Sequence, residues 1–268
     1  MVLLPTAASV VFTWIESSRS SAGLDVYRQL LAGESRVSEF WQSVSFTLMV
    51  GVVSTVIAGV ISLFVVSWWH QHRSTRRSRP PSLLSYSLVV SVPHLAWSAA
   101  LFIWLSQSGI LARISFAAGL IDSPGDFPVL VADPEGFGLI IHYTTKETPF
   151  IVVAGIAALS TQSAGLNDIA AGLGAGWFKR VRFVTWPAVR PAILGSMLIS
   201  FGFVLHSVEA PAVLGASQPR MLPVVAAELF SEPSVERRAI AAALGVLLAV
   251  LAAAAGGVGA ALVRRRRL

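Results

Sequence analysis

Four long windows without any Asp, Glu, Lys or Arg constrain this chain more than any other feature of its sequence. They cover residues 40–72, 80–112, 191–208 and 239–263. Each window is long enough for a helix to cross a hydrocarbon core of about 30 Å. Only 13% of all residues are charged, whereas a soluble domain carries roughly a quarter. The sequence therefore predicts an all-α polytopic membrane protein.

Charge-free length and flanking residues together predict six membrane spans within one transmembrane domain, residues 1–268. The predicted spans cover approximately residues 1–15, 44–69, 83–106, 137–160, 191–215 and 239–263. The first span is short, and it lacks the positive n-region and the clear cleavage site of a secretory signal. A polar segment, residues 161–190, separates the fourth predicted span from the fifth.

Basic residues are distributed unequally between the two sides of this topology. Twelve Lys and Arg lie in segments 70–82 and 161–190 and in the tail Arg264–Arg267, whereas the three other loops hold seven. Those three loops also hold eleven acidic residues. Cytoplasmic loops of membrane proteins carry the excess of Lys and Arg. The distribution therefore predicts that both termini and segment 161–190 lie in the cytoplasm.

Several classes of chemistry find no support in the sequence. The absence of cysteine excludes disulfides and thiolate metal sites, and the five histidines show neither H-x-x-x-H nor H-E-x-x-H spacing. The G-x-G-x-G run at 172–176 follows no predicted strand, and G-x-x-x-x-G-K-[ST] does not occur. The basic pI comes from arginines between apolar segments, which does not indicate nucleic-acid binding. We expect no metal site and no cofactor on this chain.

Residues 168–191, DIAAGLGAGWFKRVRFVTWPAVRP, form a polar island between two apolar spans. Asn167 or Asp168 can cap a first short helix, and Gly174 predicts a turn after it. A second helix is expected from Trp177 to Thr185, with Trp177, Phe178, Val181 and Val184 on one stripe. We expect Pro187 to end that helix and Pro191 to begin the next span. Such a helix–turn–helix elbow has an apolar edge that must rest on lipid, as an amphipathic helix does, or on another protein.

The island resembles the EAA loop of permease subunits from binding-protein-dependent ABC importers with the type I fold. In that pattern a glycine follows an acidic residue by six positions, a proline follows the glycine by thirteen, and a second proline follows by four. The matching positions here are Asp168, Gly174, Pro187 and Pro191, with Ala170 and Ala175 also fitting. This chain differs from the usual pattern in having Asp168 in place of Glu and Ile169 in place of the first Ala.

This resemblance implies a six-helix permease whose elbow is a coupling helix seated on a separate ATPase. It assigns that contact to Asp168, Ala170, Gly174, Ala175, Trp177, Phe178, Pro187 and Pro191. It also implies a bacterial inner-membrane location, two ABC ATPase subunits that bind ATP and Mg²⁺, a second permease subunit and an extracytoplasmic solute-binding protein. The stretches KETPF (146–150) and SVEAPAVLG (207–215) are similar to the branch that imports polyamines, ferric iron and thiamine.

Polar residues within the predicted spans are candidates for a solute pathway, because an unpartnered charge in lipid costs about 2.5–3.5 kcal/mol. The candidates are His142, Lys146, Glu147, His206 and Glu209, with His94 and Trp97 as further ones. A structural alternative is that Lys146 pairs with a carboxylate and locks two helices. For His94, beside Pro93, we expect a hydrogen bond to a carbonyl that the proline leaves unpaired.

Two other functional classes remain open at this point. An integral membrane enzyme would need a nucleophile or metal constellation at membrane depth, and neither H-E-x-x-H nor G-x-S-x-G occurs. An autonomous secondary transporter or channel would be expected to contain inverted repeats, which are not visible in the sequence, and it would leave the elbow without a role.

Overall fold

The computed structural model describes residues 40–72, 83–160 and 165–264, together with Ile15, Tyr27, Arg28 and Leu30. Apart from Ile15, the predicted first span lies outside this part, as do most of the loop before residue 40, residues 73–82, residues 161–164 and the last four residues. The long helices of the described part are α3 (Phe40–His72), α7 (Phe137–Ser160), α10 (Trp186–His206) and α13 (Val235–Arg264). The shorter ones are α4 (Leu83–Ser91), α5 (His94–Leu105), α6 (Ile110–Ala117), α8 (Gly165–Gly172), α9 (Trp177–Arg180), α11 (Glu209–Leu214) and α12 (Leu222–Ser231).

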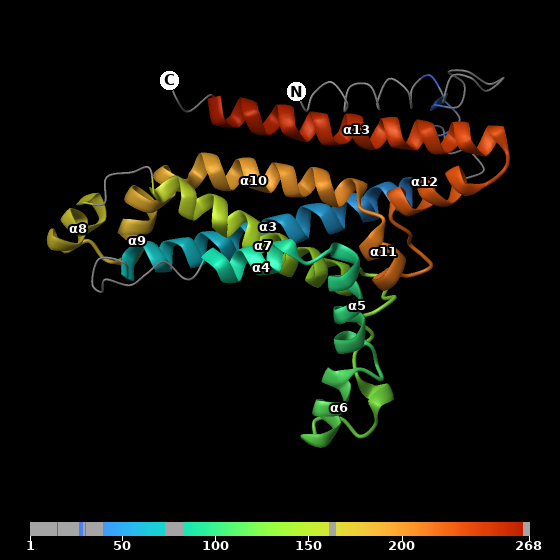
Figure 1. Ribbon diagram of the computed structural model, residues 1–268, viewed down its shortest axis with the longest axis horizontal. Coiled ribbons are helices and arrows are strands. Elements are labelled where there is room, and N and C mark those ends of the chain that lie inside the picture. Colours follow the sequence, from blue (N-terminus) through green and yellow to red (C-terminus); the bar gives the residue numbers. More distant parts are fainter. Residues whose placement is uncertain are drawn as a thin grey trace.

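The long helices run side by side and form an elongated bundle (Figure 1). Helix α7 packs against α3, α10 and α4, and α13 packs against α10 and α12. Buried apolar side chains fill the space between them; those between α3, α7 and α10 include Val66, Ile156 and Ile193. Gly155 allows α7 to approach α3 closely, because a Cβ at this position would lie 2.9 Å from a methyl carbon of Val66.

Four of the described helices are long and apolar enough to cross a membrane, judged by length and composition. They are Phe40–His72, His94–Ala117, Trp177–His206 and Val235–Gly257. Helix α7, which matches the fourth predicted span residue for residue, is not among them. Predicted spans 44–69 and 239–263 lie inside α3 and α13. All-helical architecture is thus confirmed, and the number of six spans stays a prediction.

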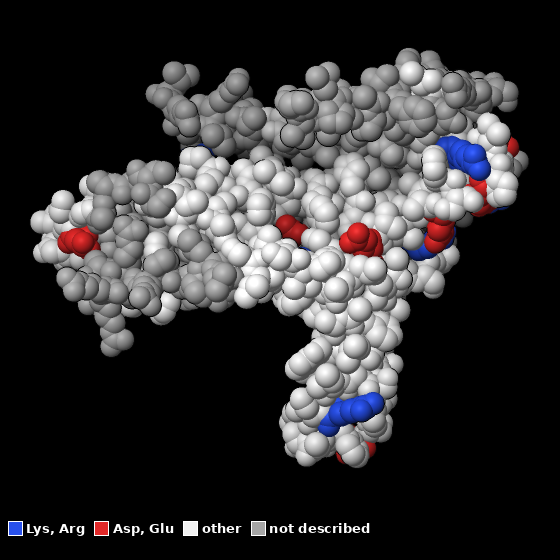
Figure 2. Space-filling model, viewed as in Figure 1, with Lys and Arg blue, Asp and Glu red and all other residues white. Residues whose placement is uncertain are grey.

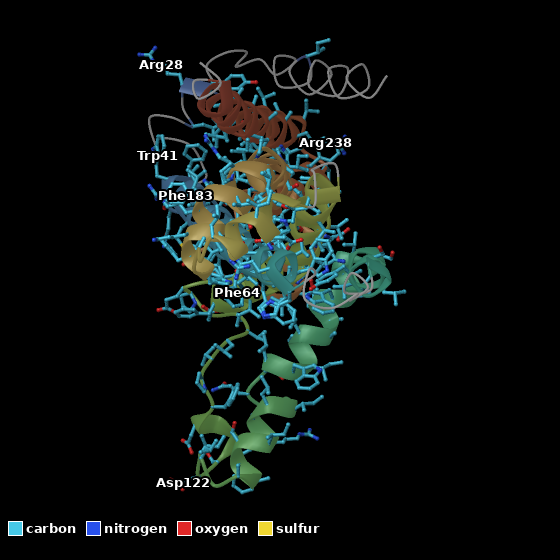
Figure 3. All side chains as sticks on the ribbon, turned by 90° about the vertical axis from the view of Figure 1, so that its left-hand side faces the viewer. Arg28, Trp41, Phe64, Asp122, Phe183 and Arg238 are labelled. Atoms are coloured by element: carbon cyan, nitrogen blue, oxygen red, sulfur yellow. The ribbon has the colours of Figure 1, made fainter. Side chains whose placement is uncertain are left out.

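The predicted span 83–106 is not one continuous helix. It breaks at Val92 and Pro93, where the helical path of α4 ends and α5 begins. Proline at position 93 has no N–H to continue the α4 hydrogen-bond ladder, and its backbone is extended, with φ −59° and ψ 143°. Helices α5 and α6 project from the bundle as an arm (Figure 1), and Asp122 lies at the end of this arm (Figure 3).

The predicted span 191–215 is also divided. Helix α10 ends at His206, Ser207 is extended, and the short α11 starts at Glu209. Charged side chains on the face shown in Figure 2 are sparse along the bundle, and more of them lie towards its ends and on the arm. This distribution suits a protein whose middle is surrounded by lipid.

Candidate functional site

The turn inside the elbow is a Schellman motif built around Gly174. Gly174 has φ +78°, a left-handed conformation that glycine adopts without a side-chain penalty. The N–H of Gly174 donates to the carbonyl of Ala171, and the N–H of Ala175 donates to the carbonyl of Ala170, both at 3.0 Å. This pair of hydrogen bonds satisfies the last carbonyls of α8. The turn predicted from the glycines is confirmed, and Ala170 and Ala175 meet through their backbones.

The prediction that Pro187 ends the second elbow helix is wrong. Helical backbone continues from Trp177 to His206, and Pro191 lies inside α10. A five-residue π-helical segment, η2 (Val181–Thr185), directly precedes α10, and the N–H of Trp186 donates to the carbonyl of Val181 five residues earlier. The wider π turn makes room for the proline ring, which would otherwise clash with a carbonyl one turn before it.

Asn167 is not a helix cap, although the sequence suggested that role. Helix α8 begins at Gly165, and the buried side chain of Asn167 donates from Nδ2 to the carbonyl of His70 in α3 at 3.4 Å. Asp168 lies in the first turn of α8 and is exposed. A carboxylate there interacts favourably with the positive end of the helix dipole.

The elbow presents apolar side chains to its surroundings. Leu173, Phe178 and Phe183 are 83%, 69% and 69% exposed, and Ile169 and Trp177 are exposed as well. This set differs from the predicted stripe: Val181 and Val184 are only half-exposed, and sequence reasoning missed Phe183. The π segment changes the helical period after Arg180, so a stripe drawn at α-helical spacing selects the wrong residues.

Three polar contacts join the elbow to the last turn of α3. They involve His70, Gln71, Asn167, Trp177 and Thr185. Sequence reasoning did not find the roles of His70, Gln71 and Thr185. The signal available was the change from an apolar span to two adjacent polar residues after Trp69.

A second group of polar side chains, which we call the polar cluster, lies between α5, α7 and α10. It consists of His94, His142, Glu147 and Ser200. Ser200 Oγ donates to Glu147 Oε2 at 2.6 Å, and His94 Nε2 lies 3.8 Å from Glu147 Oε1. His94 Nδ1 lies 3.4 Å from His142 Nε2, and His142 Nδ1 lies 3.3 Å from the hydroxyl of Ser98. A hollow of about 210 Å³ opens beside Glu147 and Ser200, with Phe150 and Phe203 among its walls.

Lys146 joins two helices, but its partners are carbonyls and not the carboxylate that the sequence suggested. Its Nζ donates to the carbonyls of Val89 and Val90, at 2.6 and 3.1 Å. Both carbonyls belong to the last turn of α4, where Pro93 supplies no N–H, and that of Val89 also accepts from the N–H of Val92 at 3.3 Å. The hydrogen bond to a carbonyl near Pro93 that was expected of His94 is thus made by Lys146. The ring of His94 faces His142 and Glu147 instead.

Like Lys146, two other predicted pathway residues, His206 and Glu209, lie outside the polar cluster. His206 is exposed at the end of α10, with Nδ1 2.8 Å from the carbonyl of Gly202. Glu209 is exposed in the first turn of α11. Trp97 donates from Nε1 to the hydroxyl of Thr145 at 3.0 Å and so ties α5 to α7.

Comparisons with known proteins find a relative in sequence and two solved structures of similar fold. The chain is 24% identical over an alignment of 217 residues to the inner membrane ABC transporter permease protein YnjC of Escherichia coli (strain K12); the match covers 77% of this chain and 39% of that relative. The chain thus spans well under half the length of this curated relative. A crystal structure of a bacterial ABC transporter involved in the import of the acidic polysaccharide alginate is similar in fold, with a TM-score of 0.73 and 18% identity, covering 98% of this chain and 94% of that chain.

A second solved structure has the same fold. It is the bacterial alginate ABC transporter in complex with an alginate pentasaccharide-bound periplasmic protein, with a TM-score of 0.72, 19% identity, and coverage of 98% of this chain and 93% of that chain. The family of binding-protein-dependent transport system inner membrane components matches residues 73–268. Because this match takes in far more than half of the sequence, the chain belongs to that family of transporter membrane components.

Proposed function

We propose that the chain is the permease subunit of an ATP-driven importer and moves a small solute across the bacterial inner membrane by alternating access. In this proposal it has six spans and cytoplasmic termini and works with a second permease subunit, two ABC ATPases and an extracytoplasmic binding protein. ATP is hydrolysed on the partner ATPases. The observation that carries the proposal is the elbow, which displays apolar side chains and is continuous with a long apolar helix.

The position of the elbow favours a protein partner over a lipid surface. Helix α8 lies at the extreme end of the bundle, beyond the ends of α3 and α10 (Figure 1). If the long helices cross the bilayer, α8 and the turn that follows it, with the exposed side chains of Ile169 and Leu173, lie in the aqueous space beyond it. An amphipathic helix that lies on a membrane would instead turn its apolar face towards the lipid. A socket on an ATPase subunit would cover these side chains, and its movement would rotate the elbow with the attached helix.

Photo-crosslinking from the elbow tests this assignment. A photoreactive phenylalanine analogue at Phe178 should capture a polypeptide that hydrolyses ATP, whereas the same analogue at Val250, which is exposed on α13, should capture lipid. Gly174→Val should abolish retention of the ATPase during purification, because a β-branched residue resists the left-handed backbone. Gly172→Ala is the matched control, since its backbone is helical and an added Cβ would meet nothing within 4 Å. Capture of phospholipid alone at Phe178 in every nucleotide state would refute the proposal.

The polar cluster and Lys146 lie beside the proposed solute route. We assign His142, Glu147 and the more distant His206 and Glu209 to this route as a proposal, supported by the hollow that opens at Glu147. Uptake and ATPase stimulation should fall in Glu147→Gln and Glu209→Gln within the reconstituted complex. Wild-type uptake in both variants would remove them from the route.

Solute identity is proposed from sequence similarity alone: a polyamine, ferric iron, thiamine or a related small solute. The two solved structures are of transporters for alginate, an acidic polysaccharide, which differs from these small solutes in charge and size. Mass spectrometry of the ligand that co-purifies with the binding protein decides between these classes. A bound oligosaccharide would overturn the assignment to the polyamine, iron and thiamine branch.

The outer end of the bundle offers a surface for the binding protein. A hollow of about 370 Å³ lies between α11 and α12 and the ends of α3 and α7, and Arg220 and Glu228 at its wall form an ion pair with a 2.5 Å contact. It lies at the end opposite to the elbow (Figure 1). We place the docking surface of the binding protein here.

A further inference from the structure

The last turn of α3 contacts each of the three parts of the elbow. His70 Nδ1 lies 2.9 Å from the hydroxyl of Thr185 in η2. The backbone carbonyl of His70 accepts a hydrogen bond from Asn167 in α8 at 3.4 Å, and Gln71 Nε2 donates to the carbonyl of Trp177 in α9 at 3.3 Å. The side chains of His70, Gln71, Asn167 and Thr185 are all buried. We call this set of contacts the α3 clasp.

The stretch that leads from the elbow into α10 contains features at which helices bend. Between Val181 and Pro191 the helix contains a π segment and two prolines. Prolines lack the N–H that would complete the helical ladder, and long helices kink where prolines or π-bulges interrupt them. A push on the elbow would therefore be partly absorbed by bending in this stretch unless another contact held it.

Helix α3 is well placed to supply that contact. Trp69, one residue before His70, is buried in the core cluster that includes Val189 and Ile193 of α10 and Ile156 of α7. Phe64 of α3 also lies against Trp177, with ring centroids 6.1 Å apart. The end of α3 is thus fixed in the bundle on one side and fixed to the elbow on the other.

We propose that the α3 clasp makes the elbow and α3 a single rigid unit, so that movement of the elbow drives α3 together with α10. His70 and Thr185 are then positioning residues for coupling: they do not face the ATPase, and they determine how much of its movement reaches the membrane helices. This inference rests on the proposed function, since it requires that a motor subunit moves the elbow.

The test uses the complete transporter in liposomes, with the ATPase and the binding protein that purify with it. The readout is the factor by which the liganded binding protein stimulates ATP hydrolysis, because this signal must pass through the membrane helices. We expect His70→Ala and Thr185→Val to lower that factor by roughly two- to thirtyfold, the range typical of coupling residues. His70→Ala should retain the ATPase and its basal hydrolysis. Thr185→Ser keeps the hydroxyl and should behave like the wild type.

A double variant separates coupling from general damage. Because His70 and Thr185 share one contact, His70→Ala combined with Thr185→Val should lose no more than the worse single variant. Full stimulation in both single variants would overturn the inference, as would fully additive losses. If Thr185→Val also loses the ATPase, His70→Ala, which changes no elbow residue, decides the result. Failure of the wild-type chain to retain any ATPase would instead refute the proposed function.

Discussion

Replacing Lys146 by Met separates a structural role of this buried lysine from a purely functional one. Lys146 Nζ donates to two carbonyls at the end of α4, Val89 and Val90. Hydrogen bonds to charged groups contribute about 1.5–3 kcal/mol each, so losing two costs about 3–6 kcal/mol. Removing a cation from membrane depth recovers about 2.5–3.5 kcal/mol on insertion scales. The midpoints of these two ranges differ by about 1.5 kcal/mol, so we expect Lys146→Met to destabilise the fold by about that amount.

The informative result is whether Lys146→Met lowers or raises the free energy of unfolding. Reversible unfolding of the purified chain in mixed micelles of mild detergent and SDS, followed by circular dichroism, measures it directly. Lys146→Arg keeps the donors and the charge, and it should lose less stability than Lys146→Met. If the lysine were kept only for transport and its contact with α4 contributed nothing, Lys146→Met would be as stable as the wild type or more stable. That result would refute the reasoning.

Three further changes follow from close contacts. Gly155→Ala should destabilise the chain by about 1–3 kcal/mol through overpacking against α3, whereas Gly195→Ala, with open space around its Cβ position, should be nearly neutral in the same unfolding assay. Ser200→Ala removes the only hydrogen bond described for Glu147 and should cost about 1–3 kcal/mol; equal stability would contradict this. Asp133→Ala removes a buried carboxylate that accepts from the first two N–H groups of α7, and thermal melting should show a loss of about 1–2 kcal/mol.

The sequence predicted the helical class and the turn at Gly174, because both depend on local rules. Charge-free length marks a span whatever its neighbours are, and a left-handed backbone favours glycine in any context. The bounds of α7 were predicted correctly for the same reason, since polar or turn-forming residues flank them on both sides. The spacing of an acidic residue, a glycine and two prolines gave the resemblance to the family, and the family match over residues 73–268 confirms it.

The errors concern features that local rules do not determine. Hydropathy does not report a break such as the one at Pro93, because both halves of the segment are apolar. The continuation of the helix through Pro187 depends on a π segment, which no residue type signals. The partner of Lys146 was missed because carbonyls of α4 are brought to it by tertiary packing alone. The contacts of His70 with the elbow arise in the same way.

The polarity of helix α7 affects how the chain is inserted into the membrane. Its buried residues include His142, Thr144, Lys146 and Glu147, and α3, α4 and α10 pack around it. A segment of this polarity partitions poorly into lipid on its own. We predict that α7 leaves the translocon only in contact with α3, which is synthesised earlier and is already in the membrane. A glycosylation reporter fused after residue 160 should therefore register efficient integration of α7 when α3 precedes it, and poor integration when α7 is presented alone.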